Sequence, residues 1–327
     1  MKTSSNTWLR RFSKLTCFST WVLIFVGGMV TSTGSGLSVP DWPLSYGSFF
    51  PPMVGGVFYE HGHRMVASFV GFLTLCLAIW LWRTETRLWV RNLGFAALGA
   101  VIAQGLLGGL TVLLFLPPPV SICHGILAQT FFVLTIFLAY SQSIERQKRE
   151  NESYKKNSSF ITISLIVIVL VYIQLILGAI MRHTKSGLAI PDFPTMGWDL
   201  RPQFDELMLN RINSWRFDHD LDPVTMFQII IHFIHRLGAL IIFLTCCLLN
   251  FIGLKYYQNS NKLIYRTILW LNFAIVVQIT LGILTVLTLK SPSITSLHVM
   301  TGATTLGLSV LLLLRVAPLT WQKSVEK

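Results

Sequence analysis

The chain has 327 residues, of which 53% are hydrophobic and only 12% are charged, and its mean hydropathy is +0.61. This composition excludes a water-soluble domain of the same size, because too few polar residues are present to cover its surface. The formal net charge is +12, which raises nucleic acid as a partner, but the placement of the basic residues argues against that reading.

Eight apolar segments are long enough to cross a bilayer, which takes about 20 mostly apolar residues per helix. They lie near 15–33, 61–82, 93–115, 119–141, 160–181, 226–253, 263–288 and 293–315. The first resembles a signal peptide because Arg10, Arg11 and Lys14 precede it, but its apolar stretch is long for one. The segment that follows it also recurs later in the chain, where cleavage has no role. We therefore expect a retained helix and an all-α polytopic membrane protein.

Lysine and arginine concentrate in alternate connections between these helices. They gather at the amino terminus, in 83–91, in 142–159, around 255–266 and at the carboxyl terminus. The segment 31–59 contains neither residue. Under the positive-inside rule this pattern predicts that both termini are cytoplasmic. The basic charge is then explained by orientation and by contact with the lipid bilayer, so no nucleic acid is expected as a partner.

The chain contains an internal duplication. The segment GLSVPDWP at 36–43 recurs as GLAIPDFP at 187–194. His63-Arg64 has its counterpart in His235-Arg236, and His124 has its counterpart in His298, at offsets of roughly 151, 172 and 174 residues for the three matches. Both halves start on the cytoplasmic side, so the repeat is parallel. Transporters more often carry inverted repeats, and a transporter is a distant alternative.

The duplication predicts two tandem four-helix bundles. The first covers 1–141, a cytoplasmic linker covers 142–159, and the second bundle covers 160–327. The second outer loop, about 182–225, is longer than the first, and we expect it to fold as a partly helical cap.

Four of the eight histidines fall at matching places near the outer starts of even-numbered helices: His63, His124, His235 and His298. A helix–helix hydrogen bond is the plainer explanation of any one of them, but ionisable residues inside a bilayer mark function by default. Two parallel helices that each offer one imidazole at one depth favour bis-histidine ligation of haem iron. Zinc is the rival metal, yet it prefers three or four ligands, and Cys123 points away round the helix from its neighbour.

The residues before the first of these histidines carry a carboxylate. Glu60 and His63 are three residues apart and share a helix face, whereas His61 turns away and is expected to be a polar residue at the interface. In the second half His232 takes the place of Glu60. A carboxylate beside haem can relay protons or steady a cation, and a histidine matches that role less well. The chemistry of the two halves is therefore expected to differ.

Two arginines and the repeated turn have open interpretations. Arg64 and Arg236 lie on the outer side against the charge bias, so they either snorkel to the headgroups or form charge-assisted bonds to haem propionates. The turn motif Gly-Leu-x-x-Pro-Asp-aromatic-Pro is expected to be rigid, with Asp41 or Asp192 bonding the chain back on itself. The alternative is that the motif lines a pocket at the haem edge.

Taken together, Glu60-x-x-His63-Arg64, the pair His235-Arg236, the later His124 and His298 and the doubled turn resemble the haem A synthase family over nearly the whole chain. The resemblance implies an oxidoreductase that converts a ring methyl group of haem O to formyl by successive hydroxylations. The haem A formed serves a terminal oxidase, so the enzyme acts in cytochrome oxidase assembly.

The resemblance also implies roles for single residues. His63 and His124 would flank the substrate haem, Glu60 would be the catalytic carboxylate, and His235 and His298 would ligate a haem b cofactor. The implied location is the inner (plasma) membrane. A haem O synthase that hands over the substrate, an electron donor that the sequence does not identify, and a homo-oligomer are the partners to consider.

The sequence departs from one branch of that family, which has paired cysteines in its outer loops. Here the five cysteines lie in or beside expected helices and no two share an outer loop, so no structural disulfide is expected. The chain looks more like the proteobacterial and mitochondrial branch. The segment 199–222 has no assignable counterpart, and no role follows for His183. The main rival function is a di-haem electron-transfer cytochrome, which predicts equivalent halves.

Overall fold

A computed structural model describes residues 7–149 and 157–317, and within these ranges it contains helices and no strand. Eight of the described helices are long and apolar enough to cross a membrane, which confirms the expected number of spans. They are α1 (Thr7–Ser32), α2 (Gly56–Thr84), α3 (Leu88–Leu113), α4 (Pro118–Ser141), α6 (Ser158–His183), α8 (Met226–Tyr257), α9 (Lys262–Leu287) and α10 (Pro292–Val316). Residues 1–6 of the first expected bundle, 150–156 of the expected linker and 318–327 of the second expected bundle lie outside the described residues.

The helix starts follow from local sequence signals. Proline occupies the first turn of α4 and of α10, where its missing N–H would have no partner inside the helix in any case. Asn157 caps α6 by accepting a hydrogen bond from the Phe160 N–H, and Asn261 caps α9 in the same way. Several helices extend beyond the apolar segments, because polar and basic residues at their ends continue the helix past the hydrocarbon region.

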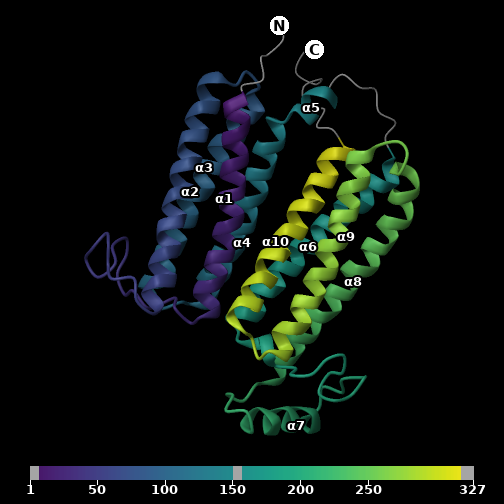
Figure 1. Cartoon of the computed structure of the whole chain (residues 1–327). Coiled ribbons are helices and arrows are strands. Elements are labelled where there is room, and N and C mark those ends of the chain that lie inside the picture. The colour runs from purple at the N-terminus through teal and green to yellow at the C-terminus, as the bar shows by residue number, and fades with distance from the viewer. Residues whose placement is uncertain (1–6, 150–156, 318–327) are drawn as a thin grey trace.

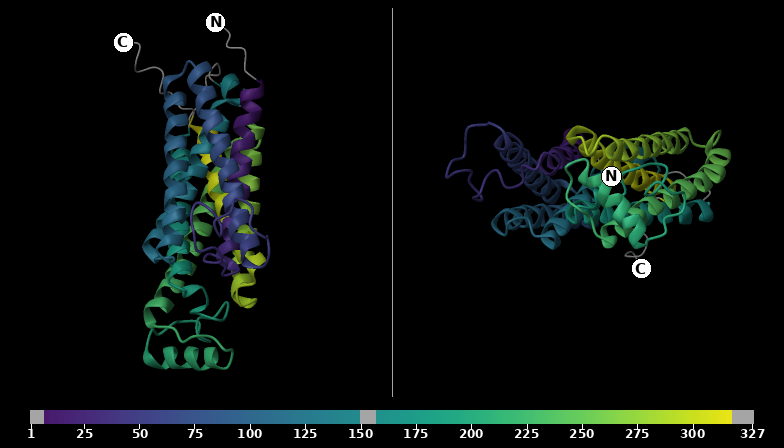
Figure 2. Two further views of the ribbon diagram at one scale, coloured as in Figure 1. Left: turned by 90° about the vertical axis from the view of Figure 1, so that its left-hand side faces the viewer. Right: turned by 90° about the horizontal axis from the view of Figure 1, so that it is seen from below.

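Each half is a four-helix bundle in which the second and fourth helices stand on a diagonal. In the first bundle α1 and α3 each pack against both α2 and α4, while α2 and α4 are not packed against each other. The second bundle repeats this arrangement, with α6 and α9 each packed against α8 and α10. Figure 2 shows the two bundles side by side when seen from below. The expected tandem arrangement is thus the observed one.

The two bundles share an interface made by equivalent helices. Helix α1 packs against α10, α6 packs against α4, and α4 also packs against α10. The Trp21 indole N–H donates to the Thr304 hydroxyl at 2.8 Å across the first contact. Thr130 and Tyr172 share a hydroxyl hydrogen bond of 2.6 Å across the second. The interface therefore combines apolar packing with polar contacts that fix its register.

The two ends of the bundles differ. The short helix α5 (Ile144–Arg149) lies at the end where α1 begins, which we call the linker end (Figure 1). The turn η1 (Ser186–Leu188) and helix α7 (Glu206–Phe217) lie at the opposite end, the cap end. Ile190, Met208 and Ile212 are buried together there. The expectation of a partly helical cap in 182–225 is confirmed.

Candidate functional site

The four candidate ligands lie at one level of the bundles. His63, His124, His235 and His298 fall within about the first three turns of α2, α4, α8 and α10. All four helices begin at the cap end and run towards the linker end. Because a helix rises 1.5 Å per residue, the four imidazoles lie at similar depths below the cap end, as the repeat predicts.

The diagonal arrangement pairs these imidazoles within each half. The helices that carry His63 and His124 are not packed against each other, so the two side chains are presented across the bundle from opposite corners. They are nevertheless close enough to interact electrostatically, and so are His235 and His298. A planar group between two opposed imidazoles is the arrangement by which helical bundles bind haem iron.

A glycine on the preceding helix makes room for each imidazole. A Cβ at Gly27, Gly108, Gly178 or Gly282 would lie 3.1, 3.2, 3.4 or 3.0 Å from the Cε1 atom of His63, His124, His235 or His298, respectively. The distances at Gly27, Gly108 and Gly282 are shorter than ordinary van der Waals contact between carbon atoms, and the distance at Gly178 lies at its lower limit. Each of the four rings therefore packs on a glycine of the preceding helix, which we call its cradle glycine. Each helical hairpin contributes one such glycine and one histidine.

Glutamines beside three of the imidazoles were missed by the sequence reasoning. The Gln104 amide nitrogen lies 3.3 Å from Nε2 of His124, and that of Gln174 lies 3.2 Å from Nδ1 of His235. Gln278 stands in the same relation to the fourth ligand of the chain. Each glutamine comes four residues before its cradle glycine, so the internal repeat held the signal that would have revealed them.

Glu60 binds the segment between α1 and α2 that contains the repeated motif 36–43, which we call the outer turn. Its carboxylate is 3% exposed, accepts a hydrogen bond of 2.8 Å from the Val39 N–H and forms a 2.7 Å ion pair with Arg64. Arg64 also donates to the main-chain oxygens of Asp41 and Leu44 at 2.8 and 2.7 Å. Glu60 and Arg64 together hold this turn against the start of α2, one helical turn from His63. We call this set of contacts the clamp.

The second half builds the same clamp with different chemistry. His232 is 3% exposed, its Nδ1 accepts from the Ile190 N–H at 3.1 Å, and its Nε2 lies 3.2 Å from Nε of Arg236. Arg236 donates to the main-chain oxygen of Ile190 at 2.9 Å. A neutral imidazole has one acceptor nitrogen where a carboxylate has two acceptor oxygens. The position is thus structurally equivalent to Glu60 but carries no negative charge.

Both guanidinium groups are therefore directed to the turns, and contact of Arg64 or Arg236 with a haem propionate stays a prediction. Asp41 accepts from the main-chain N–H groups of Tyr46 and Gly47 at 2.7 and 2.8 Å. Asp192 does the same in the second turn, with Gly197 and Trp198 as donors. These contacts confirm that the two carboxylates bond the chain back on itself.

His61 differs from its expectation as an interfacial polar residue. It is only 7% exposed, and its Nδ1 shares a 2.8 Å hydrogen bond with the Ser45 hydroxyl. The outer turn folds over this side of α2 and buries it, which helical periodicity cannot reveal. Cys123 is exposed, and the expectation that it is no ligand stays a prediction.

The donor set fits haem iron better than zinc. In residues 7–149 and 157–317 no group of three or more His, Cys, Asp or Glu side chains is placed to hold a metal ion, whereas structural zinc needs four ligands and catalytic zinc three. The Nδ1 atoms of His63 and His124 are buried without a partner among the described residues. Paired imidazoles with unused ring nitrogens, set over glycine cradles, are suited to axial ligation of haem.

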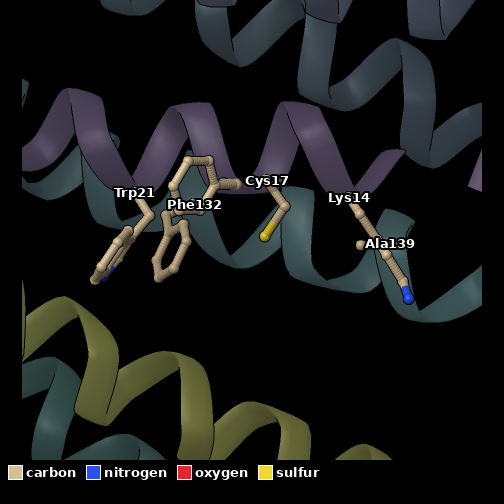
Figure 3. Close-up of a pocket in the computed structure, with 6 residues that line it drawn as sticks. Lys14, Cys17, Trp21, Phe132 and Ala139 are labelled. Atoms are coloured by element: carbon tan, nitrogen blue, oxygen red, sulfur yellow. The ribbon is translucent and has the colours of Figure 1, made fainter. Parts of the chain in front are cut away.

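A shallow apolar cavity of about 290 Å³ lies elsewhere, between α1 and α4 (Figure 3). Cys17, Trp21 and Phe132 point into it, and Lys14 and Ala139 lie at its side nearer the linker end. The four histidines do not line it. It is therefore not part of the candidate site.

Comparison with known proteins places the chain in a family. Residues 10–55 and 54–310 match the family described as COX15-CtaA, cytochrome oxidase assembly protein. "Heme A synthase" of Lysinibacillus sphaericus is 27% identical over 330 residues, which cover 98% of this chain and 99% of the relative. Proteins of the same name from Bacillus licheniformis and Bacillus pumilus are 33% and 29% identical over 195 and 271 residues. These cover 58% and 80% of this chain, and 63% and 80% of the respective relatives. With paired histidines in both bundles and a family match over most of its length, the chain belongs to the COX15-CtaA family of cytochrome oxidase assembly proteins.

Proposed function

We propose that this protein is a haem A synthase, an oxidoreductase that converts a ring methyl group of haem O to formyl. The observation that carries the proposal is the pair of opposed imidazoles in each of two bundles, only one of which has a carboxylate beside it. The named relatives support the same activity. A substrate that is itself a haem explains why a second bis-histidine site is needed next to the first.

The first bundle is the proposed substrate site. His63 and His124 hold haem O, and Glu60 is the proposed catalytic carboxylate. The iron of a bound haem supplies the electron-transfer chemistry that the side chains lack. The protein residues orient the ring and exclude water, and the Glu60 carboxylate forms an ion pair with Arg64 one helical turn from His63. A carboxylate there is suited to steadying positive charge or taking up a proton near the reacting carbon.

The second bundle is the proposed cofactor site. His235 and His298 hold a haem b that stays with the protein, and the clamp next to them contains His232 in place of a carboxylate. This loss supports a resident haem in the second half, because a haem that only carries electrons needs no acid–base group beside it. The division of the chain into substrate and cofactor bundles follows from the same asymmetry.

The proposed setting is the inner membrane, with the linker end in the cytoplasm. Arg83 lies in the last turn of α2, Arg87 directly precedes α3, and Lys262 begins α9, all at the linker end. The positive-inside rule then assigns the cap end, and with it both haem sites, to the outer side. Haem O delivered by a haem O synthase, a separate electron donor and association into a homo-oligomer belong to the proposal as well.

The test is to express the full chain with a source of haem O, extract the porphyrins and weigh them. The enzyme yields hydroxymethyl and formyl haem, whereas the rival di-haem electron-transfer cytochrome yields only unchanged haem. A His235→Ala variant should lose the resident haem b. A preparation that binds two haems permanently and never alters either would overturn the proposal.

A further inference from the structure

The two bundles differ at their cap ends, in the short connection between the third and fourth helices. Leu116 lies in this connection of the first half with a φ of 58°, and Lys290 lies at the equivalent place of the second half with a φ of 64°. A Cβ at Gly36 would lie 3.3 Å from Cδ1 of Leu116. In the same way, a Cβ at Gly187 would lie 3.6 Å from Cδ of Lys290. Each side chain thus reaches the first glycine of its repeated motif, but only the second carries a charge.

Two further cations of the second half also have uncharged counterparts. Lys185 follows α6 with a φ of 56°, and at the repeat offset of roughly 151 residues it corresponds to Gly34, which has a φ of 69°. Arg182 lies in the last turn of α6 and corresponds to Thr31. We call Arg182, Lys185 and Lys290 the cationic rim. The first bundle has no charge at any of the three equivalent positions.

The members of the rim lie close to one another and lack an acidic partner. Both lysines are exposed, yet partial desolvation of the amine lowers the pKa of Lys290 below its ordinary value of 10.5. The positive charges of Arg216, Lys185 and Arg182 lower that pKa further. Neither lysine amine forms a hydrogen bond or an ion pair within the part of the chain that the structure describes. Because like charges repel, this cluster favours an anion among its members.

The two arginines near the lysines have different contacts. Arg216 donates to the main-chain oxygen of Leu188 at 2.9 Å, which holds α7 against η1. Arg182 uses a single nitrogen, Nη2, which donates to the main-chain oxygen of Gly28 and to the Ser32 hydroxyl at 2.8 and 2.7 Å. A guanidinium has five N–H donors, and those on Nε and Nη1 of Arg182 have no partner among residues 7–149 and 157–317. Arg182 is therefore held in place with donors left for a ligand.

The rim lies directly beyond the proposed haem b site. Arg182 comes one helical turn after the cradle glycine Gly178 of α6. Lys290 comes eight residues before His298, which corresponds to roughly 12 Å of helix towards the cap end. A haem is apolar except at its propionate edge, and a carboxylate without a partner in an apolar setting is costly. The propionates are therefore expected to face the end at which the cations lie.

We propose that Lys290, Lys185 and Arg182 bind the propionate groups of the haem held by the second bundle. This inference rests on the proposed function and deepens it, because it names what retains the resident haem. Arginine and lysine both form charge-assisted hydrogen bonds to carboxylates. The substrate haem of the first bundle gains no such bonds from the equivalent positions, which suits a haem that must enter and leave.

A lipid phosphate offers the same kind of negatively charged oxygen and is the rival source. Headgroups surround both bundles alike, whereas the cations occur at the cap end of the second bundle only. Anionic lipid is also concentrated in the cytoplasmic leaflet, which is the proposed side of the linker end. The asymmetry therefore favours the haem.

The first experiment measures how fast the resident haem leaves. Purified full-length protein with its haem is mixed with excess apomyoglobin, which captures dissociated haem, and absorbance follows the transfer. Lys185→Gln combined with Lys290→Gln should speed the transfer roughly tenfold, the size expected when two partly exposed ion pairs are lost. Lys290→Arg keeps the charge and should leave the rate close to that of the parent. The control is Arg211→Gln, which removes a cap cation paired with Asp199 and should leave the rate unchanged.

Salt and a modified haem separate ion pairing from a general loss of stability. Raising the ionic strength should speed haem loss from the parent but not from the double variant, because screening weakens only pairs that exist. The dimethyl ester of haem b has no carboxylates and should leave both proteins equally fast. Equal rates for haem b itself would overturn the inference, and loss of a co-purified anionic lipid from the double variant would then assign the rim to headgroups.

The same preparations distinguish this failure from failure of the proposed function. A parent protein that carries no haem, or that keeps it after His235→Ala, would refute the proposed function. A parent that loses its haem after His235→Ala but holds it equally well with and without the two lysines would refute the role of the rim alone.

The second experiment gives the first bundle a cation at its cap end. In protein loaded with haem O, Leu116→Lys should slow transfer from the first bundle roughly threefold, the effect of one partly exposed ion pair. Leu116→Gln, which is polar but uncharged, is the matched control and should leave the rate unchanged. His63→Ala identifies the phase that belongs to the first bundle. Equal rates in the parent and Leu116→Lys would show that a cation at this place does not reach the propionates.

Discussion

The two bundles are alike in the hairpins α3–α4 and α9–α10 and different in the hairpins α1–α2 and α6–α8. In the first pair of hairpins the glutamine, the glycine and the histidine are all kept at equivalent places. In the second pair, Leu23 replaces the glutamine and Glu60 replaces His232. Among these site positions, the two halves differ at one corner of the first bundle, which is where we place the reacting face of the substrate.

The largest expected effect comes from Glu60. Glu60→Gln should lower the conversion of haem O by at least about a hundredfold, the smaller effect typical of general acid–base groups, because the negative charge beside His63 is removed. His232→Gln, the equivalent change in the second bundle, should leave conversion within about twofold of the parent. Extracted porphyrins are quantified by chromatography and mass for both variants.

Haem content separates this prediction from simple misfolding. Glu60→Gln keeps an oxygen that can accept from the Val39 N–H, so haem should stay bound. Glu60→His makes the first clamp resemble the second and should be equally inactive with its haem retained. Normal yields of formyl haem from either Glu60 variant would show that the carboxylate only holds the turn.

A smaller effect is expected at the glycine cradles. Gly108→Ala places a methyl group 3.2 Å from the His124 ring, so the ring must shift and the affinity of the first bundle for haem should fall roughly tenfold. Gly105→Ala on the same helix is the matched control, since a Cβ there meets nothing within 4 Å. Binding is followed by titration with haem. Equal affinities of the two variants would mean that the cradle does not set the orientation of the imidazole.

The smallest expected effect is a pH dependence of the first outer turn. Hydrogen bonds from the Gly47 and Tyr46 N–H groups lower the pKa of Asp41 below its ordinary value of 3.8, and the charge of Arg64 lowers it further. Because the pKa is depressed in the folded protein, the stabilisation by Asp41 is present above pH 3.8 and is lost as the pH falls through the folded value. Asp41→Asn should abolish this dependence.

Trp42 adjoins Asp41 in that turn and supplies the measurement. A Cβ at Gly109 would lie 2.7 Å from its ring, so the indole is packed on α3 while the turn is closed. The fluorescence of the parent minus that of Trp42→Phe reports on this packing as the pH is lowered. An identical acid transition in the parent and in Asp41→Asn would rule out the carboxylate as its cause.

Much of the fold could be predicted from the sequence because the bilayer imposes a simple rule. Every span must be a long apolar helix, so the eight segments and the helical cap could be located. The repeat then placed His63, His124, His235 and His298 at a common depth. The contacts of Asp41 and Asp192 could also be predicted, because such turns bond locally.

The remaining features depend on contacts between helices that are distant in sequence. Whether Gln174 lies beside His235 is decided by how α6 packs on α8, and an isolated glutamine in a span gives no sign of its neighbour. Likewise, the sequence left open whether Arg64 and Arg236 reach the headgroups or a haem propionate, and their bonds to the main chain of the outer turn could not be predicted from it. The burial of His61 follows from the same fold of that turn.

The contact between the two bundles relates the halves in the way that a two-fold axis relates the copies of a dimer. Helix α1 meets α10 and helix α6 meets α4, and these two contacts are exchanged when the halves are exchanged. A self-complementary contact of this kind is what two copies of a single four-helix protein form around a two-fold axis. In such a dimer any substitution would alter both haem sites at once. A single polypeptide is free of that constraint, so Leu23 and Glu60 in one half need no match in the other.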